Sequence, residues 1–245
     1  MATFDRKIYF DSVRASLFGG ALTQQQVDGM AAILTGWEEL SPPLSDLRWL
    51  SYMLATTKHE TASTCWPIEE YGKGQGMSYG KQDPETGQTY YGRGFVQLTW
   101  RENYVKATRE LGLAGEHDLE WHAEMALDLD IAADVMFRGM VEGWFRKSSD
   151  GKPQTLGRYF SASRDDPYTA REIINGDKSK VPSWSGGVSI GKLIAGYHQE
   201  FLAALQAALV EEIQPEPEPE YQVATIAITV PAGIAVQITV NGEAR

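Results

Sequence analysis

The feature that most constrains the fold is a helical repeat of apolar residues within the first 60 positions. Thr23, with Gln26 three residues later, fits a capping box, which marks the start of a helix. The apolar residues that follow share one helical face, as do those of a second helix that we expect Ser45 to cap. The two stripes are Val27, Met30, Ile33, Leu34 and Trp37, and then Leu47, Leu50, Leu54 and Thr57.

Helix-breaking residues divide this pattern. We expect Ser41, Pro42 and Pro43 to separate the two helices, and Pro67 to stop the second one. That helix then delivers His59 and Glu60 at its C-terminal end. The Gly-rich stretch 71–94 is typical of loops with one short hairpin.

Helical periodicity returns at about 120–145 and again over 189–210. The order of elements predicts a mainly α fold, in which two helical lobes flank a cleft beside a small loop and β-hairpin insertion. The apolar stripe of the last helix is Leu193, Ile194, Tyr197, Phe201, Leu205 and Leu209.

The C-terminal sequence changes character abruptly. Gln214 is followed by alternating Pro and Glu up to residue 220, which predicts an extended linker over 214–220. Residues 221–245 alternate apolar and polar positions, as a β-hairpin does, and so short a hairpin must pack on another surface to be stable. We therefore predict one domain over 1–213, a linker over 214–220 and a β-hairpin tail over 221–245 that serves assembly, self-association or targeting.

Charge, apolar runs and cysteine content exclude several classes. A net charge of −11 in 245 residues argues against binding to phosphate backbones, so we expect no nucleic-acid partner. No apolar run approaches the roughly 20 residues of a membrane span, and the first residues lack the apolar core of a signal peptide. A single Cys excludes an intrachain disulfide and suits a reducing compartment.

The segment 58–72, KHETASTCWPIEEYG, concentrates reactive side chains. Zinc binding of the HExxH type is disfavoured because Ser63 occupies the position of the second histidine, so we expect no metal and no other cofactor. A nucleophilic Cys65 would need a nearby base and a lowered pKa, and no sequence signal indicates either.

Paired carboxylates are the third interpretation of this segment. Cleavage of a glycosidic bond needs one protonated carboxylic acid and one ionised carboxylate. Glu60 ends an apolar helix, where partial burial raises a pKa, whereas Glu69 or Glu70 follows Pro67 in a polar loop that favours ionisation. On spacing alone, three surface glutamates remain the simpler alternative.

A second segment, YYGRGFVQLTWRENY at 90–104, adds a specific resemblance. Together with HETA at 59–62 and IING at 173–176, it resembles glycoside hydrolase family 19, the chitinases and their bacteriophage endolysin relatives. The single Cys and the lack of a signal favour the phage branch, because plant chitinases of this family are disulfide-rich and secreted. The resemblance implies a lysozyme-like fold.

The resemblance also implies a role for each matching residue. Glu60 would be the general acid and Glu69 the general base of an inverting displacement by water, with Glu70 a rival for the second role. Glu70 and Arg93 would otherwise support the carboxylates, although Arg93 also fits a purely structural role. Asn175 equally fits a tight turn before Gly176, and the aromatic residues equally fit a core. Substrate would be bound by Gln97, Thr99, Asn103, Asn175, Tyr90 and Trp100.

We therefore predict an endolysin that hydrolyses β-1,4 glycosidic bonds of bacterial peptidoglycan, as a muramidase does, for host cell lysis. We expect it to be made in the cytoplasm of the host bacterium and to act on glycan strands of the wall after release. Two alternatives stay open: a chitinase on the same scaffold, and a wall-binding or virion-associated protein with accessory lytic activity.

Overall fold

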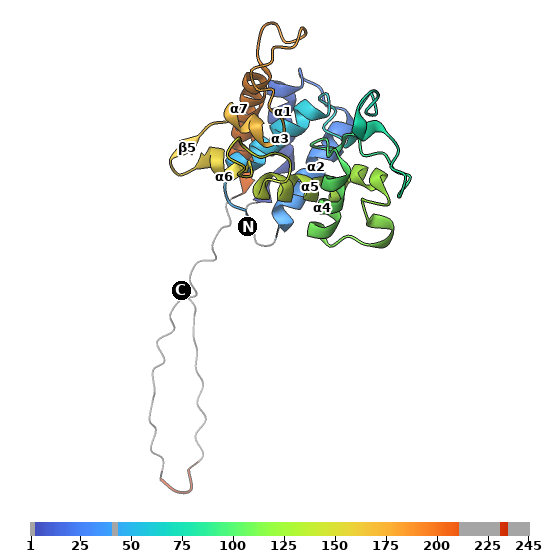
Figure 1. Ribbon diagram of the computed structural model, residues 1–245. Coiled ribbons are helices and arrows are strands. Elements are labelled where there is room, and N and C mark those ends of the chain that lie inside the picture. The colour runs from blue at the N-terminus through green and yellow to red at the C-terminus, as the bar shows by residue number, and fades with distance from the viewer. Residues whose placement is uncertain (1–2, 41–43, 211–230, 235–245) are drawn as a thin grey trace. The chain divides into compact units, whose positions relative to one another are not determined.

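The chain divides into two compact units, Met1–Glu212 and Ile213–Arg245. The computed structural model describes residues 3–40, 44–210 and 231–234 (Figure 1). None of the helices in these ranges combines the length and apolar character that crossing a membrane requires.

The first unit is built mainly from helices, which confirms the predicted mainly α fold. Three short antiparallel pairs accompany them: β1 (Thr3–Phe4) with β6 (Leu209–Val210), β2 (Ile68–Glu69) with β3 (Arg93–Gly94), and β4 (Phe160–Ser161) with β5 (Arg164–Asp165). The described residues of this unit also form the 3₁₀ helices η1 (Ser78–Gly80), η2 (Gly115–His117), η3 (Ala123–Leu127) and η4 (Thr169–Ile173). The α-helices are α1 (Arg6–Leu17), α2 (Gln24–Glu39), α3 (Leu47–Glu60), α4 (Arg101–Leu111), α5 (Leu129–Glu142), α6 (Leu156–Tyr159) and α7 (Ile190–Ala208).

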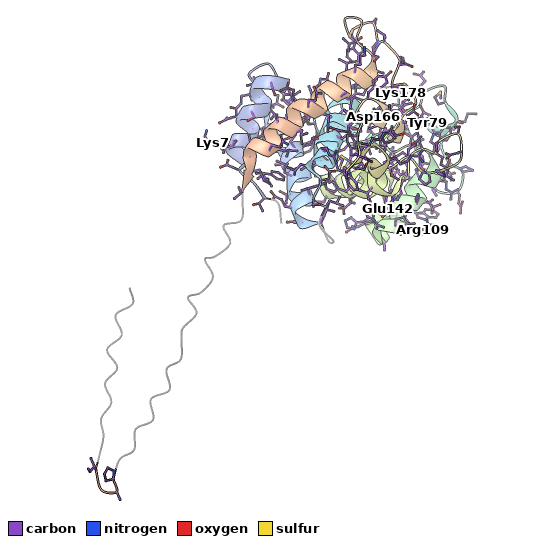
Figure 2. All side chains as sticks on the ribbon, turned by 90° about the vertical axis from the view of Figure 1, so that its left-hand side faces the viewer. Lys7, Tyr79, Arg109, Glu142, Asp166 and Lys178 are labelled. Carbon is purple, nitrogen blue, oxygen red and sulfur yellow. The ribbon has the colours of Figure 1, made fainter. Side chains whose placement is uncertain are left out.

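The helices form two groups. In one group α7 packs against both α3 and α1, and in the other α5 packs against α2 and α4. Figure 2 shows the two groups through Lys7 on α1 and Arg109 on α4, which lie at opposite sides of the unit in this view. One continuous apolar core joins the groups, because α3 also contacts α2 and α5.

The first two predicted helices are confirmed, with one corrected boundary. The capping box of Thr23 and Gln26 is present, and the predicted face of α2 is buried except for the half-buried Val27. The cap of α3 is Asp46 rather than Ser45, because the Asp46 carboxylate accepts the backbone N–H of Arg48. The predicted breaker at 41–43 lies outside the described residues.

Other boundaries differ from the prediction for local reasons. The helix expected over about 120–145 is split into η3 and α5, since the Asp128 carboxylate caps a new start by accepting from Asp130 and Ile131. The helix α4 was not predicted. Leu209, expected on the stripe of the last helix, lies in β6 and is exposed.

The second unit is described only over residues 231–234. These residues form a turn, in which Gly233 has a φ of +103° and the N–H of Ile234 donates to the carbonyl of Pro231. The predicted linker over 214–220 and the strands of the predicted hairpin over 221–245 lie outside the described residues, so both stay predictions.

Candidate active site

A cleft of about 390 Å³ brings most of the predicted site residues together. Glu60 reaches it from the end of α3, and further walls come from the segment after β3 and from the segment after η4. Tyr79, Phe145 and Arg146 also line the cleft, and the sequence analysis did not predict them. The predicted residues that meet there are Glu60, Gln97, Thr99, Trp100, Asn103 and Asn175.

Glu60 is placed by the end of its helix. It is the last residue of α3, and Thr61 closes the helix, because both its N–H and its hydroxyl donate to the carbonyl of Thr57. The helix itself is fixed by packing against α7. The Glu60 side chain is only 14% exposed, so its carboxylate is held at the cleft wall and not turned out into solvent.

A buried arginine, Arg171 in η4, holds the Glu60 carboxylate. Its Nη1 donates to Oε1 of Glu60, while its Nε donates to Asp177 at 2.7 Å. Burial alone would raise the pKa of Asp177, but the hydrogen bonds and charge of Arg171 lower it. Because Asp177 occupies the other side of the guanidinium, Glu60 receives a single N–H. Its Oε2 makes no hydrogen bond within the described part of the chain.

Glu69 lies on β2, where its backbone pairs with Arg93 on β3. Its carboxylate accepts the hydroxyl of Tyr91 at 2.5 Å and lies 2.7 Å from the Lys73 ammonium. Burial would raise the pKa of Glu69, but these hydrogen bonds and the neighbouring positive charges lower it. Glu69 is therefore an ionised carboxylate at neutral pH. It lies on the small sheet beside the cleft rather than in the cleft lining itself.

Arg93 supports this carboxylate from the core side. It is almost fully buried, and its Nε lies 3.5 Å from Oε1 of Glu69. Its guanidinium also stacks 3.8 Å from the centre of the Tyr91 ring and donates to the Tyr104 hydroxyl. Arg93 thus orients both Glu69 and the tyrosine that donates to Glu69, as expected for a residue that braces a carboxylate.

Glu70 has a different set of partners from Glu69. Its carboxylate accepts the Tyr79 hydroxyl and the backbone N–H of Gly92, both at 3.3 Å. Tyr79 lines the cleft and meets Trp100 edge-on, with ring centres 5.0 Å apart. Glu70 therefore holds a cleft wall in place. The cationic surroundings of Glu69 keep its carboxylate ionised, and a group that accepts a proton from water must be ionised.

The polar residues after β3 that line the cleft also make side-chain hydrogen bonds to backbone carbonyls. Gln97 donates through Nε2 to the carbonyl of Ile68 at 3.1 Å. Asn103 donates through Nδ2 to the carbonyl of Thr99 at 2.7 Å. Each bond uses a side-chain donor, which leaves the carbonyl oxygens of the two amides, Oε1 and Oδ1, as acceptors for a ligand.

Asn175 follows η4 and lies on the cleft surface. The guanidinium of Arg146 packs closely against the neighbouring residue, Gly176, where a Cβ would lie 2.8 Å from Nη2 of Arg146. Arg146 in turn pairs with Glu172 at 2.6 Å. The segment is therefore a turn and a cleft wall at once, so the two interpretations of Asn175 are compatible.

The two predicted aromatic residues have different environments. Trp100 is 42% exposed and lines the cleft, so one face of its indole is open to a ligand. Tyr90 is buried, and its hydroxyl bonds to the carbonyl of Glu120 and to Thr86. The prediction that Tyr90 stacks on substrate in this cleft is therefore wrong, because its ring packs edge-on against Tyr104 in the core.

Left-handed backbone conformations cluster around the cleft. Positive φ values occur at Ala62, Ser63 and Cys65 after Glu60, and at Gln97 and Trp100 in the cleft lining. Such conformations cost non-glycine residues about 1–3 kcal/mol each and persist where the surrounding structure enforces them. The backbone around the site is thus held in a specific, strained path.

The thiol alternative is not supported by the surroundings of Cys65. The side chain is buried, and burial raises the pKa of the thiol to about 12. A neutral, inaccessible thiol is not a nucleophile. Within the described ranges, no three His, Cys, Asp or Glu side chains are grouped so that they could hold a metal ion.

The fold is similar to that of solved chitinases, and part of the sequence is similar to endochitinases. The crystal structure of chitinase C from Streptomyces griseus superposes with a TM-score of 0.51 at 16% identity, covering 83% of this chain and 76% of that one. This likeness shows a shared fold, and it confirms the predicted resemblance to chitinases.

Similarity in sequence is confined to part of the chain. An endochitinase of Arabidopsis thaliana is 42% identical over 67 residues, which cover 27% of this chain and 24% of that protein. Endochitinase A of Zea mays is 30% identical over 113 residues, covering 45% of this chain and 38% of the maize protein. The chain thus spans well under half the length of these relatives. No protein-family model matches it.

Proposed function

We propose that the chain hydrolyses β-1,4 glycosidic bonds in bacterial peptidoglycan and acts as an endolysin in host cell lysis. The observation that carries this proposal is the contrast between two carboxylates. Glu60 lines the cleft with one oxygen free of protein hydrogen bonds, whereas Glu69 is held ionised beside Lys73 and Arg93. The fold and the similarity to endochitinases support the glycoside hydrolase class.

In this proposal Glu60 donates one proton and Glu69 accepts one. Glu60 gives its proton to the glycosidic oxygen as the bond from that oxygen to the anomeric carbon breaks. A water molecule attacks the same carbon from the opposite face and gives its proton to Glu69, which inverts the configuration. Exchange with solvent then returns a proton to Glu60 and removes the proton from Glu69.

The remaining cleft residues would hold the sugar. Trp100 offers an open indole face for stacking, and the free carbonyl oxygens of Gln97 and Asn103 suit the N–H groups of N-acetylated sugars. Asn175 faces them from the η4 side of the cleft. Nuclear magnetic resonance of the first product would test the stereochemistry, since an initial α-anomer from a β-linked substrate indicates inversion.

Chitin is the second candidate substrate, because the similar curated proteins are endochitinases. Purified peptidoglycan sacculi and chitin oligomers should be incubated with the protein and the products identified by mass spectrometry. We expect muropeptides cut at a glycosidic bond. Cleavage of chitin oligomers with intact sacculi would make the protein a chitinase. Binding to sacculi without any product would favour the wall-binding or virion-associated alternative.

The cellular setting is part of the same proposal. The protein would be synthesised in the cytoplasm of the host bacterium and would reach the wall on release. Lysis from outside, with outer-membrane-permeabilised cells, tests the wall-degrading step separately from the release step.

A further inference from the structure

A second cavity, of about 400 Å³, is lined by residues at the α3 terminus other than the cleft residue Glu60. It is lined by residues to which the proposed mechanism gives no role. Because His59 immediately precedes Glu60, the last turn of α3 contributes to both cavities. The lining consists of Lys58, His59, Ala62, Ser63, Trp184 and Tyr197.

The Lys58 ammonium is the unusual group in this cavity. The residue is only 6% exposed, and its ammonium donates to the Ser63 hydroxyl at 3.0 Å. It also lies 4.4 Å from the centre of the Phe18 ring and 5.0 Å from that of Tyr197. Within the described residues, no carboxylate lies within ion-pair distance of it. Burial lowers the pKa of Lys58.

A buried lysine without a counter-ion is costly, because lysine is almost never fully buried unless it is paired. The two aromatic faces and one hydroxyl offset part of this cost. A carboxylate would offset more, and the cavity leaves space for one beside the ammonium.

Trp184 supplies an apolar surface at the mouth of the same cavity. It is 66% exposed, and its ring centre lies 6.4 Å from that of His59. It belongs to the loop between η4 and α7, which also carries Asp177, the partner of Arg171. An exposed indole beside a buried ammonium suits a ligand that has an apolar or sugar face next to a negative charge.

We propose that this cavity binds a carboxylate carried by a side group of the glycan, with the Lys58 ammonium as its partner and Trp184 packed on the chain that bears it. This inference rests on the proposed function. Chitin carries no carboxylates, whereas peptidoglycan carries lactyl groups extended by peptides with free carboxylates. The cavity would thus recognise the substituted strand beside the bond that is cut.

The test compares Lys58→Met with the wild type on three substrates. These are glycan strands with peptides, strands whose peptides an amidase has removed to leave free lactyl carboxylates, and chitin oligomers. We expect kcat/KM to fall about tenfold on peptide-bearing strands, as loss of a charge-assisted hydrogen bond predicts, and to stay within about twofold on chitin oligomers. A loss shared by the lactyl strands would show that the ammonium also binds the lactyl carboxylate, which is an amide wherever a peptide is attached. A loss confined to peptide-bearing strands would identify the peptide.

Two further variants separate recognition from folding. Trp184→Ala removes an exposed side chain and should reproduce the loss on peptide-bearing strands, while Lys192→Met, at an exposed lysine of α7, should change nothing. Equal losses for Lys58→Met on all three substrates, or no loss on any, would overturn the inference.

A binding measurement distinguishes failure of the inference from failure of the proposed function. Isothermal titration of the full chain with a free peptidoglycan tetrapeptide requires no hydrolysis. We expect binding that Lys58→Met and Trp184→Ala each weaken about tenfold. If the protein binds the tetrapeptide in this way but cuts no glycan, only the proposed hydrolase function is refuted. An active hydrolase whose titration is the same with or without Lys58 would refute the carboxylate site.

Discussion

Arg171 contacts the carboxylate of Glu60 across 111 residues of sequence. Since the same guanidinium also holds Asp177, the cleft carboxylate is fixed by the loop after η4 as well as by its own helix. Removing the negative charge of Glu60 while keeping its shape therefore probes chemistry with little effect on this anchor, because an amide oxygen also accepts from arginine.

Glu60→Gln should leave the melting temperature within about 2 °C of the wild type and reduce lysis of permeabilised cells by at least about 100-fold, the usual contribution of a general acid. Turbidity of the cell suspension measures the rate. Glu124→Gln, at an exposed glutamate, is the matched control. Activity above about a tenth of the wild type would remove Glu60 from the mechanism.

Glu69→Gln and Glu70→Gln should differ in kind. The first should lower kcat by at least about 100-fold, since it removes the ionised base. The second should lower it less than about tenfold and reduce stability by about 1 kcal/mol, because it weakens hydrogen bonds with Tyr79 and Gly92. Steady-state kinetics and urea unfolding measure the two effects. The reverse ranking would make Glu70 the base.

Lys73→Ala should move the acidic limb of the pH–rate profile to higher pH. Lys73 is 62% exposed and pairs with Glu69, and its charge helps to lower the pKa of that carboxylate. Because an exposed ion pair is worth at most about 1 kcal/mol, the shift should be under about one pH unit. If the acidic limb stays in place or moves to lower pH, the ionisation of Glu69 does not determine the pH of that limb.

His198 should make the protein less stable as the pH falls. Burial lowers the pKa of this imidazole to about 4, below its ordinary value of 6.5, and its Nδ1 bonds to the Ser51 hydroxyl. The unfolded state thus binds more protons between these pH values, so the stabilisation is complete above pH 6.5 and is lost towards pH 4. The loss amounts to about 3 kcal/mol. Urea unfolding at both pH values should show a smaller difference in His198→Gln. Equal differences would contradict the assignment.

A chain ended at Glu212 should fold and keep its glycan-cutting activity, because the first unit has its own core. Calorimetry and a muropeptide assay measure this directly. If the tail serves assembly, light scattering should show a smaller oligomer for the shortened chain than for the full chain. Loss of folding in the shortened chain would show that the second unit supports the first.

The helices could be predicted from sequence because their signals are local. The capping box at Thr23 and the apolar stripe of α3 depend on residues within a few turns of each other, and together they place Glu60 at a helix end. The boundary of α3 was missed by one residue because Ser45 and Asp46 are both good caps, and only the structure shows which side chain accepts a backbone N–H.

The partners of the carboxylates could not be predicted in the same way. Arg171 and Asp177 flank the IING segment, but nothing local links them to Glu60. Glu69 and Glu70 are adjacent in sequence, and their roles differ because Glu69 pairs with Lys73 whereas Glu70 accepts the Tyr79 hydroxyl. The buried position of Tyr90 depends on packing against Tyr104, whereas a sequence motif records only the residue type.

The pairing of β1 with β6 sets Thr3 opposite Val210, so the first and last described residues of the first unit are neighbours. A short peptide can therefore join them into a closed ring, and new ends can be opened at the exposed turn around Gly151. In such a circularly permuted form, a second protein module could be fused at the new chain ends near Gly151. The β1–β6 strand pair would then stay intact and away from the fusion point.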